Sequence, residues 1–474
     1  MKRMKKMKKM RMLSLALIAI LMVGSLAGCT GGSESADGKV TISVGNWPAK
    51  EGAALDAKEA QKAAFEQKYP NITIKPDTWA FDFKTYYPKA AAGLLPTTYS
   101  CYFTEGEKII RGGYAKEMTE IMNKLGYTDL LNPKLKNVLS DGDKIYFVPE
   151  SCYTLGIAFN TKLFEQAGLM NPDGTPQVPA TWDELLEMAK VIKEKTGVAG
   201  FALPTSNNAG GWLFTSLAWS FGTEFMKEVS DGKWEATFNS DACASALQYV
   251  KDLKWKHNVF PANILIDNAE YMKLFSTGQL AMIITAPDIA QKVVTYDMNK
   301  DDLGMFPVPA GPARRVALIG GKLTTVANNA TPEQLDAAFK WFEYQAISPF
   351  MSDAVASSQK NDIDVALAED RAVGLKHMQA WNSESEVVKN YNKLVEENVN
   401  VNINHFRLFN ESLDDPSIEL QAEEPINAQD LYKILDGCLQ EVLNNENADC
   451  KKLVDDAAAK FQKEFLDEYN TATE

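Results

Sequence analysis

Apolar and polar residues alternate along KVTISV at residues 39–44, a stretch rich in β-branched side chains that breaks at Gly45. This alternation predicts a half-buried strand. A helical pattern follows over residues 57–69 and stops at Pro70, and NITIKPDTW at residues 71–79 again reads as a strand. A strand–helix–strand order is typical of a parallel sheet covered by helices. The beginning of this pattern therefore predicts an α/β fold.

Two later helices carry clear start signals. Thr181 and Glu184 have the spacing of a capping box, and Gly197 follows the last helical position. Thr331 and Gln334 repeat this spacing, with a proline at the first helical position between them. Such signals satisfy backbone groups that have no partner at helix ends. We expect helices directly after both threonines.

A mostly apolar run of about 14 residues lies near the N-terminus, at residues 13–26. It is shorter than the roughly 20 residues that span a bilayer, and the eleven residues before it include seven positive charges and no acid. This pattern predicts a secretory signal peptide over residues 1–28. Leu26-Ala27-Gly28-Cys29 resembles the bacterial lipobox, so Cys29 is the expected lipid attachment site. The alternative is an ordinary signal peptide with a chance cysteine.

Composition narrows the possible partners once the signal peptide is removed. The formal net charge then falls from −14 to −21, because the seven positive charges are lost. Such a charge disfavours binding to nucleic acid or to an acidic membrane surface. Residues 29–38 are rich in glycine and polar residues and predict a flexible tether. The remaining chain exceeds the roughly 250–300 residues at which single cores stop growing, so two lobes are expected.

The cysteines and histidines give no sign of a metal or catalytic centre. Apart from Cys29 there are five cysteines, an odd number, and we favour buried free thiols over a local Cys438–Cys450 bridge. None of the three histidines lies in a metal-binding motif, and nucleophile-elbow and phosphate-loop motifs are absent from the sequence. We therefore expect no metal, no cofactor and no enzymatic activity. A glycosidase with two carboxylates remains an alternative, because it needs no local motif.

Several stretches, taken in order, resemble the extracellular solute-binding proteins of ABC importers, the carbohydrate-type family that includes maltose-binding protein. They include AAFEQKYPNITIK, GDKIYFVPESCYTLGIAFNTKLFEQAG, LFSTGQLAMIITAPD and GGKLTTVANNATPEQLDAAFKWFEY. The resemblance implies a two-lobed periplasmic-binding-protein-like fold of type II, with three crossings and a ligand cleft between the lobes. It assigns residues 39–148 and 287–348 to lobe 1, and residues 149–286 and 349–474 to lobe 2. The crossings are expected near Pro149, Ala286 and Pro349.

Sugar sites combine aromatic platforms with polar groups held in fixed geometry. The positions that match cleft segments of the family, or that follow predicted strands, give a set of candidate ligand-binding residues: Trp47, Asp82, Tyr102, Glu105, Tyr153, Asn208, Trp212, Asp288, Gly321, Lys322 and Phe406.

The expected protein is a monomeric, lipid-anchored solute-binding protein on the outer side of the cell membrane. The resemblance implies that it captures a sugar or oligosaccharide and delivers it to the permease subunits of an ABC transporter by closing its cleft. One alternative is a ligand-sensing lipoprotein that serves a membrane receptor. Another is a secreted carbohydrate-active enzyme.

Overall fold

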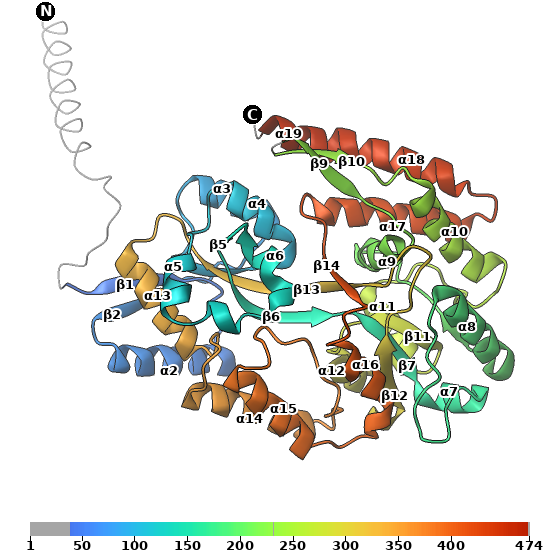
Figure 1. Cartoon of the computed structure of the whole chain (residues 1–474), viewed down its shortest axis with the longest axis horizontal. Helices are drawn as coiled ribbons and strands as arrows, with labels where there is room; N and C mark the ends of the chain where they lie inside the picture. The colour runs from blue at the N-terminus through green and yellow to red at the C-terminus, as the bar shows by residue number, and fades with distance from the viewer. Residues whose placement is uncertain (1–37, 231, 473–474) are drawn as a thin grey trace, which may run out of the picture.

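The computed structural model describes residues 38–230 and 232–472, which form two lobes around two separate sheets (Figure 1). The sheet of the first lobe has the strand order β14-β13-β3-β1-β2. A sixth strand, β6, also pairs with β13. β1 runs parallel to β2 and β3, whereas β13 runs antiparallel to β3 and β6. The strands are β1 (Val40–Val44), β2 (Ile72–Pro76), β3 (Thr98–Tyr102), β6 (Val148–Thr154), β13 (Val316–Val326) and β14 (Glu419–Ala422).

Helices cover this sheet and enclose two apolar clusters. One cluster contains Ile42, Phe65 and Trp341, and the other contains Tyr99 and Phe147. A short hairpin of β4 (Ser140–Asp141) and β5 (Lys144–Ile145) lies beside them. The helices on this side are α2 (Ala53–Lys68), α3 (Phe83–Ala91), α4 (Gly106–Arg111), α5 (Thr119–Lys124), α6 (Lys136–Leu139), α13 (Pro332–Tyr344), α14 (Asp353–Ala368) and α15 (Glu386–Glu397).

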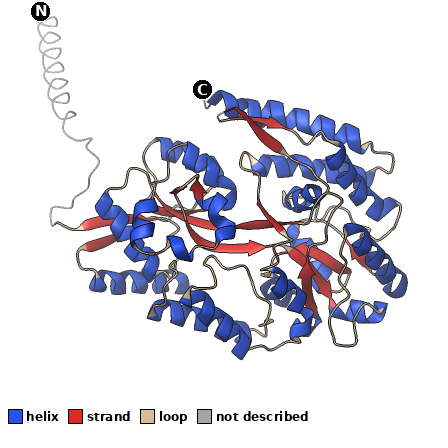
Figure 2. Ribbon diagram, in the orientation of Figure 1, coloured by secondary structure: helices blue, strands red, loops and turns tan. Residues whose placement is uncertain are grey.

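Figure 2 shows the strands of the second lobe with helices around them. Four of these strands form a sheet with the order β12-β7-β11-β8. Every residue of β7 and β11 is buried, as expected of central strands covered on both faces. A separate hairpin consists of β9 and β10. The strands are β7 (Gly156–Asn160), β8 (Ala199–Phe201), β9 (Met226–Ser230), β10 (Lys233–Ala236), β11 (Leu280–Thr285) and β12 (Leu303–Pro307).

One large apolar cluster forms the core of the second lobe and draws on residues from Leu155 to Leu466. Within the described ranges, no helix is long and apolar enough to cross a membrane. The helices of this lobe are α7 (Thr161–Ala167), α8 (Trp182–Thr196), α9 (Ala209–Ser220), α10 (Asp241–Trp255), α11 (Asn268–Ser276), α12 (Ile289–Lys292), α16 (Arg407–Ser412), α17 (Ala428–Asn444), α18 (Cys450–Phe461) and α19 (Asp467–Ala472).

The predicted strands and caps agree with the structure. The strand expected over residues 39–44 is β1, and the second strand is β2. The Thr181 hydroxyl accepts a hydrogen bond from the backbone N–H of Glu184 at the start of α8. Thr331 and Gln334 form a reciprocal capping box at the start of α13. Local sequence therefore determined where these elements begin.

The structure places two of the three crossings away from their expected positions. Shortly after the expected first crossing, Cys152 lies in a first-lobe core and Leu155 in the second-lobe core. The second lies inside β13, between Leu318 and Ile319, rather than near Ala286. The physical reason is that β12 pairs with β7, which keeps the chain in the second lobe.

The segment after Pro349 also differs from the expected division. α14 and α15 pack together, and Trp381 and Val388 lie in a first-lobe core. The chain is back in the second lobe by Phe406, which is fully buried in that core. The chain therefore stays with the first lobe through α15 rather than leaving it near Pro349, and β14 later pairs with β13 of the first-lobe sheet.

The five cysteines outside the N-terminal segment are buried and free, as predicted: Cys101, Cys152, Cys243, Cys438 and Cys450. Cys438 and Cys450 lie on α17 and α18 without forming a bridge. Cys29 and the predicted tether lie outside the described residues, apart from the last tether residue, Gly38. Among the described side chains, no group of three or more histidines, cysteines, aspartates or glutamates could hold a metal ion.

Candidate functional site

A cavity of about 440 Å³ lies between the two lobes. We call it the cleft cavity. Most of the residues that line this cavity lie at the end of a strand or just before a helix. In open α/β sheets, ligands bind at such strand ends. β3 and the helical turn after it supply three of the lining residues, the residue directly after β14 supplies one, and α17 supplies one. The nine lining residues are Phe81, Asp82, Tyr102, Thr104, Glu105, Tyr153, Gly321, Glu423 and Gln429.

Two glutamates from different segments face this cavity. Glu105 is buried, and its Oε2 accepts a hydrogen bond from the Tyr87 hydroxyl at 3.0 Å. Glu423 is half-buried, and its Oε1 accepts a hydrogen bond from the Tyr432 hydroxyl at 3.1 Å. Burial raises the pKa of Glu423 to about 7, and the negative charge of Glu105 acts in the same direction. The two carboxylates therefore lie close enough to repel each other.

Aromatic rings make up another part of the lining. Tyr102 is 52% exposed, and its ring meets the ring of Phe81 edge to face at 5.9 Å. The pKa of Tyr153 is raised by burial first and then by the charges of Glu423 and Asp288. These rings offer flat faces to an apolar surface of a ligand.

Two glycines of β13 allow close contacts with Tyr153 and with the backbone of β6. A Cβ on Gly320 would lie 2.3 Å from the hydroxyl oxygen of Tyr153. A Cβ on Gly321 would lie 2.1 Å from the backbone oxygen of Ser151, on the paired strand β6. Only glycine fits at these two positions without movement of the neighbouring strand or ring.

The structure brings five of the predicted ligand-binding residues together in the cleft cavity: Asp82, Tyr102, Glu105, Tyr153 and Gly321. Asp82 also caps α3, since its Oδ1 accepts a hydrogen bond from the backbone N–H of Thr85 at 3.1 Å.

Three further candidates lie next to the lining. Asn208 donates a hydrogen bond to the side chain of Gln429 at 3.2 Å. A hydrogen bond with Trp212 lowers the pKa of Glu423, although burial outweighs it. Asp288 is exposed and forms an ion pair with Lys292 at 2.8 Å. These residues could support the lining, but none of them lines the cavity.

The remaining three candidates lie elsewhere. Trp47 is 3% exposed and stacks on Trp341 in a first-lobe core. Phe406 is fully buried in the second-lobe core. Lys322 is exposed on β13 and does not line the cavity. Packing against distant aromatic and aliphatic residues explains why the first two are not available to a ligand.

Four lining residues were not among the candidates: Phe81, Thr104, Glu423 and Gln429. Phe81 and Thr104 are sequence neighbours of Asp82 and Glu105, so proximity could have indicated them. Glu423 follows the short strand β14, and a carboxylate after a strand is a usable signal. Gln429 lies in the first turn of α17 and has no local signal.

A second, larger cavity of about 1240 Å³ adjoins the first, and Glu423 lines both. Two contacts cross between the lobes here. The Lys108 ammonium donates a hydrogen bond to the Asn427 side-chain oxygen at 3.1 Å, and Arg111 Nη2 lies 2.9 Å from Glu228 Oε2. We call these four residues the interlobe clasp. Their contacts hold α4 of the first lobe against the second lobe.

The sequence profile of the bacterial extracellular solute-binding proteins matches residues 49–346. The multiple sugar-binding protein of Streptococcus mutans is 28% identical over 355 residues, which are 70% of this chain and 76% of that protein. A binding protein of Brucella abortus is 27% identical over 286 residues, which are 59% of this chain. This match covers 66% of the Brucella protein, just under two thirds of its length.

A solved structure of maltose-bound MalE3 from T. maritima has the same fold. Its TM-score is 0.60 at 20% identity, and the comparison covers 90% of this chain and 99% of that one. The two-lobed α/β fold of type II is thereby confirmed. The matched family is one of solute-binding proteins, which agrees with the prediction that this protein is not an enzyme and leaves the glycosidase alternative without support. The family profile covers more than half of the chain, and the chain therefore belongs to the bacterial extracellular solute-binding protein family.

Proposed function

We propose that the protein captures a sugar or oligosaccharide outside the membrane and delivers it to the permease of an ABC transporter. The observation that carries this proposal is a cavity at the lobe junction that is lined with aromatic rings and carboxylates. Tyr102 and Glu105 come from the first lobe and Gln429 from the second-lobe helix α17, and Glu423 accepts a hydrogen bond from Tyr432 of that helix. Sugars present apolar C–H faces beside hydroxyl donors, which this lining matches. The sugar-binding relative and the maltose-bound structure support the same ligand class.

Closure of the cleft follows from this arrangement. A ligand that contacts both lobes binds the closed form more tightly than the open form and therefore shifts the equilibrium toward closure. In the proposed cycle the permease recognises the closed form. A ligand-sensing role would use the same closure, but no contact of the described residues favours it.

Calorimetric titration of the mature protein with a panel of mono- and oligosaccharides tests the ligand class. We expect binding of at least one sugar, and Tyr102→Ala should weaken it about tenfold through loss of a stacking face. Leu265→Ala is a suitable control, because Leu265 is 61% exposed and does not line the cleft cavity. Failure of every sugar to bind, together with binding of a peptide or a metal ion, would refute the proposed ligand class.

The lipid anchor is a separate part of the proposal. Cys29 is expected to carry the acyl chains, and several chains on one residue hold a protein firmly at a membrane, at about 0.8 kcal/mol per buried CH₂. Cys29→Ala should therefore move the protein from the membrane fraction to the medium or the soluble fraction. Cys243→Ala is the matched control, because that cysteine is buried in the second lobe. An unchanged distribution of the Cys29 variant would argue against the anchor.

A further inference from the structure

The lining of the cleft cavity is acidic. It contains three carboxylates, Asp82, Glu105 and Glu423, and none of its nine described lining residues is a lysine, arginine or histidine. The negative charge of Glu105 acts to raise the pKa of Lys108, although burial outweighs this effect. Lys108 lines the neighbouring cavity rather than the cleft cavity. Its ammonium lies over the ring of Tyr87 at 4.8 Å and donates to Asn427. The negative charge that faces the ligand is therefore not balanced from within the lining.

Two of these carboxylates come from segments far apart in the chain and interact electrostatically. Glu105 follows β3 of the first lobe, whereas Glu423 follows β14 and accepts a hydrogen bond from Tyr432 of the second-lobe helix α17. Enclosing both groups as anions away from water costs free energy, and the raised pKa of Glu423 reflects this cost. A neutral ligand leaves Glu423 largely protonated below pH 7. A positively charged group between the two carboxylates would stabilise both of them as anions.

Both carboxylates retain capacity to accept further hydrogen bonds. Glu105 accepts from the hydroxyls of Tyr87 and Thr104, and Glu423 accepts from Tyr432 and Trp212. A carboxylate offers roughly four lone-pair positions, so both glutamates can still accept from an ammonium group.

The aromatic part of the lining suits the same ligand. Phe81, Tyr102 and Tyr153 present ring faces or edges within one small cavity. Such rings attract cations and also pack against the C–H faces of a sugar ring. A sugar that carries an amino group has both features.

We propose that the ligand is an amino sugar, bound with its protonated amino group between Glu105 and Glu423. This inference rests on the proposed sugar-binding function and specifies its substrate class. The amino group contributes N–H donors and a positive charge, and the sugar ring contributes apolar faces. Acidic sugars such as uronates are excluded by the same carboxylates.

Matched sugar pairs test this proposal by calorimetry at pH 6, where the amine is protonated. The pairs are glucosamine with glucose, galactosamine with galactose, mannosamine with mannose, and the β-1,4-linked glucosamine dimer with cellobiose. We expect the amino member of at least one pair to bind about tenfold more tightly than its neutral partner. Neutral sugars that bind as tightly as their amino partners would overturn the inference and leave the proposed function standing. No binding by any sugar of the panel would overturn both.

Variants then locate the preference. Glu105→Gln removes a negative charge, and Glu423→Gln removes a carboxyl group that a bound ammonium group would hold in its ionised form. Each change should reduce the ratio of amino-sugar to neutral-sugar affinity several-fold. Glu424→Gln is the matched control, because Glu424 is buried beside Glu423 but accepts a hydrogen bond from Trp219 at 2.9 Å and lies outside the lining. Circular dichroism checks the folding of each variant. An unchanged ratio in both folded lining variants, or an equal loss in the control, would contradict the assignment.

Discussion

Tyr153 owes its position to the missing side chain of Gly320. Its hydroxyl lies where the Cβ of any other residue would be, so the ring can lie against β13 and face the cleft cavity. Because a tyrosine hydroxyl is the far end of a flexible side chain, it can move when this space is filled. The site is therefore sensitive to a single methyl group on the neighbouring strand.

Gly320→Ala should displace the Tyr153 ring and weaken ligand binding by about tenfold, with a small effect on stability. Calorimetric titration measures the affinity, and thermal unfolding measures the stability. Gly437→Ala is the control, since a Cβ on this α17 glycine meets nothing within 4 Å. That control should bind ligand normally and should be more stable by up to about 1 kcal/mol. Unchanged affinity in Gly320→Ala would show that the ring position is not important.

Glu424 links stability to pH. Burial raises the pKa of Glu424 to about 7, above the model-compound value of 4.5. Between these two pH values the folded state therefore binds more protons than the unfolded state, and the free energy of unfolding falls as the pH rises. Glu424→Gln should remove this contribution, so the variant gains stability relative to the parent from pH 4.5 to 8, by up to about 3 kcal/mol.

Urea unfolding of both proteins at pH 4.5, 6 and 8 measures this difference. Glu446→Gln is the control, because Glu446 is exposed in the turn before α18, and its difference from the parent should stay nearly constant. A difference for Glu424→Gln that does not grow with pH would argue against a buried, protonated carboxyl group.

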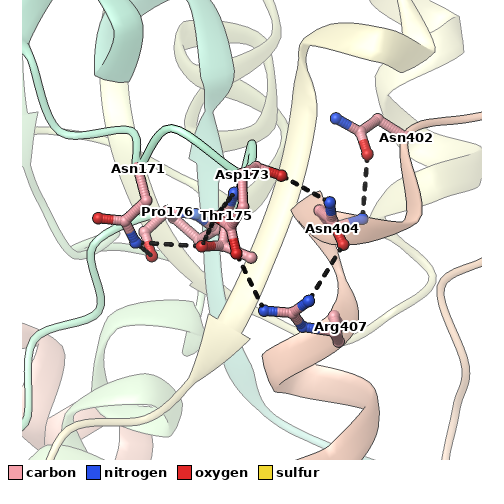
Figure 3. A network of polar contacts seen from close by, with 7 residues as sticks. All are labelled: Asn171, Asp173, Thr175, Pro176, Asn402, Asn404 and Arg407. Carbon is pink, nitrogen blue, oxygen red and sulfur yellow. Dashed lines mark hydrogen bonds and ion pairs between the residues drawn. The ribbon is translucent and has the colours of Figure 1, made fainter.

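A polar network joins the loop after α7 to the start of the short helix α16 (Figure 3). The loop after α7 contains Asp173 and Thr175, Arg407 is the first residue of α16, and Asn404 lies in the short 3-10 turn before it. The Asn404 side chain donates a hydrogen bond to the backbone oxygen of Asp173 at 2.7 Å. Arg407 Nη2 lies 3.5 Å from the Asp173 carboxylate. This network fastens the segment that returns from α15 to the second lobe.

Asn404→Ala should lower the free energy of unfolding by about 1 kcal/mol, because the half-buried Asn404 side chain loses its hydrogen bond to the backbone oxygen of Asp173. Arg407→Ala should cost less than about 0.5 kcal/mol, since its ion pair with Asp173 is exposed. Denaturant titration of the two variants measures both values. A larger loss in the arginine variant would reverse the ranking of these two contacts.

Relative motion of the lobes depends on few contacts, because each lobe has cores of its own. The interlobe clasp connects them through Lys108 with Asn427 and through Arg111 with Glu228. The pair of Arg111 and Glu228 is about one third exposed, so water and salt partly screen it. The clasp therefore stabilises the closed arrangement only modestly.

Glu228→Gln should weaken the clasp, increase the radius of gyration of the ligand-free protein, and lower ligand affinity two- to fivefold, roughly the effect of 0.5–1 kcal/mol. Small-angle X-ray scattering and calorimetry measure these effects, which should shrink at high salt. Glu187→Gln removes an ion pair within α8 and should change neither quantity. A ligand-free radius that stays the same in the Glu228 variant would contradict this role.

Features that depend only on residues close together in the sequence could be predicted from the sequence. The alternation of β1 and the caps at Thr181 and Thr331 act over a few positions, and the structure has them where the pattern predicted them. Glu105 and Tyr102 also followed, because they end a strand at the lobe junction. Such signals are local, so no knowledge of distant segments is needed to interpret them.

Only the tertiary structure decided which aromatic and acidic side chains meet. Trp47 lies against Trp341 and is closed to a ligand, although it follows a strand as a cleft residue would. Glu423 reaches the cavity of Glu105 because β14 pairs with β13 more than 100 residues earlier in the chain. Burial and charge proximity arise from contacts between segments far apart in sequence, and a linear pattern does not contain those distances.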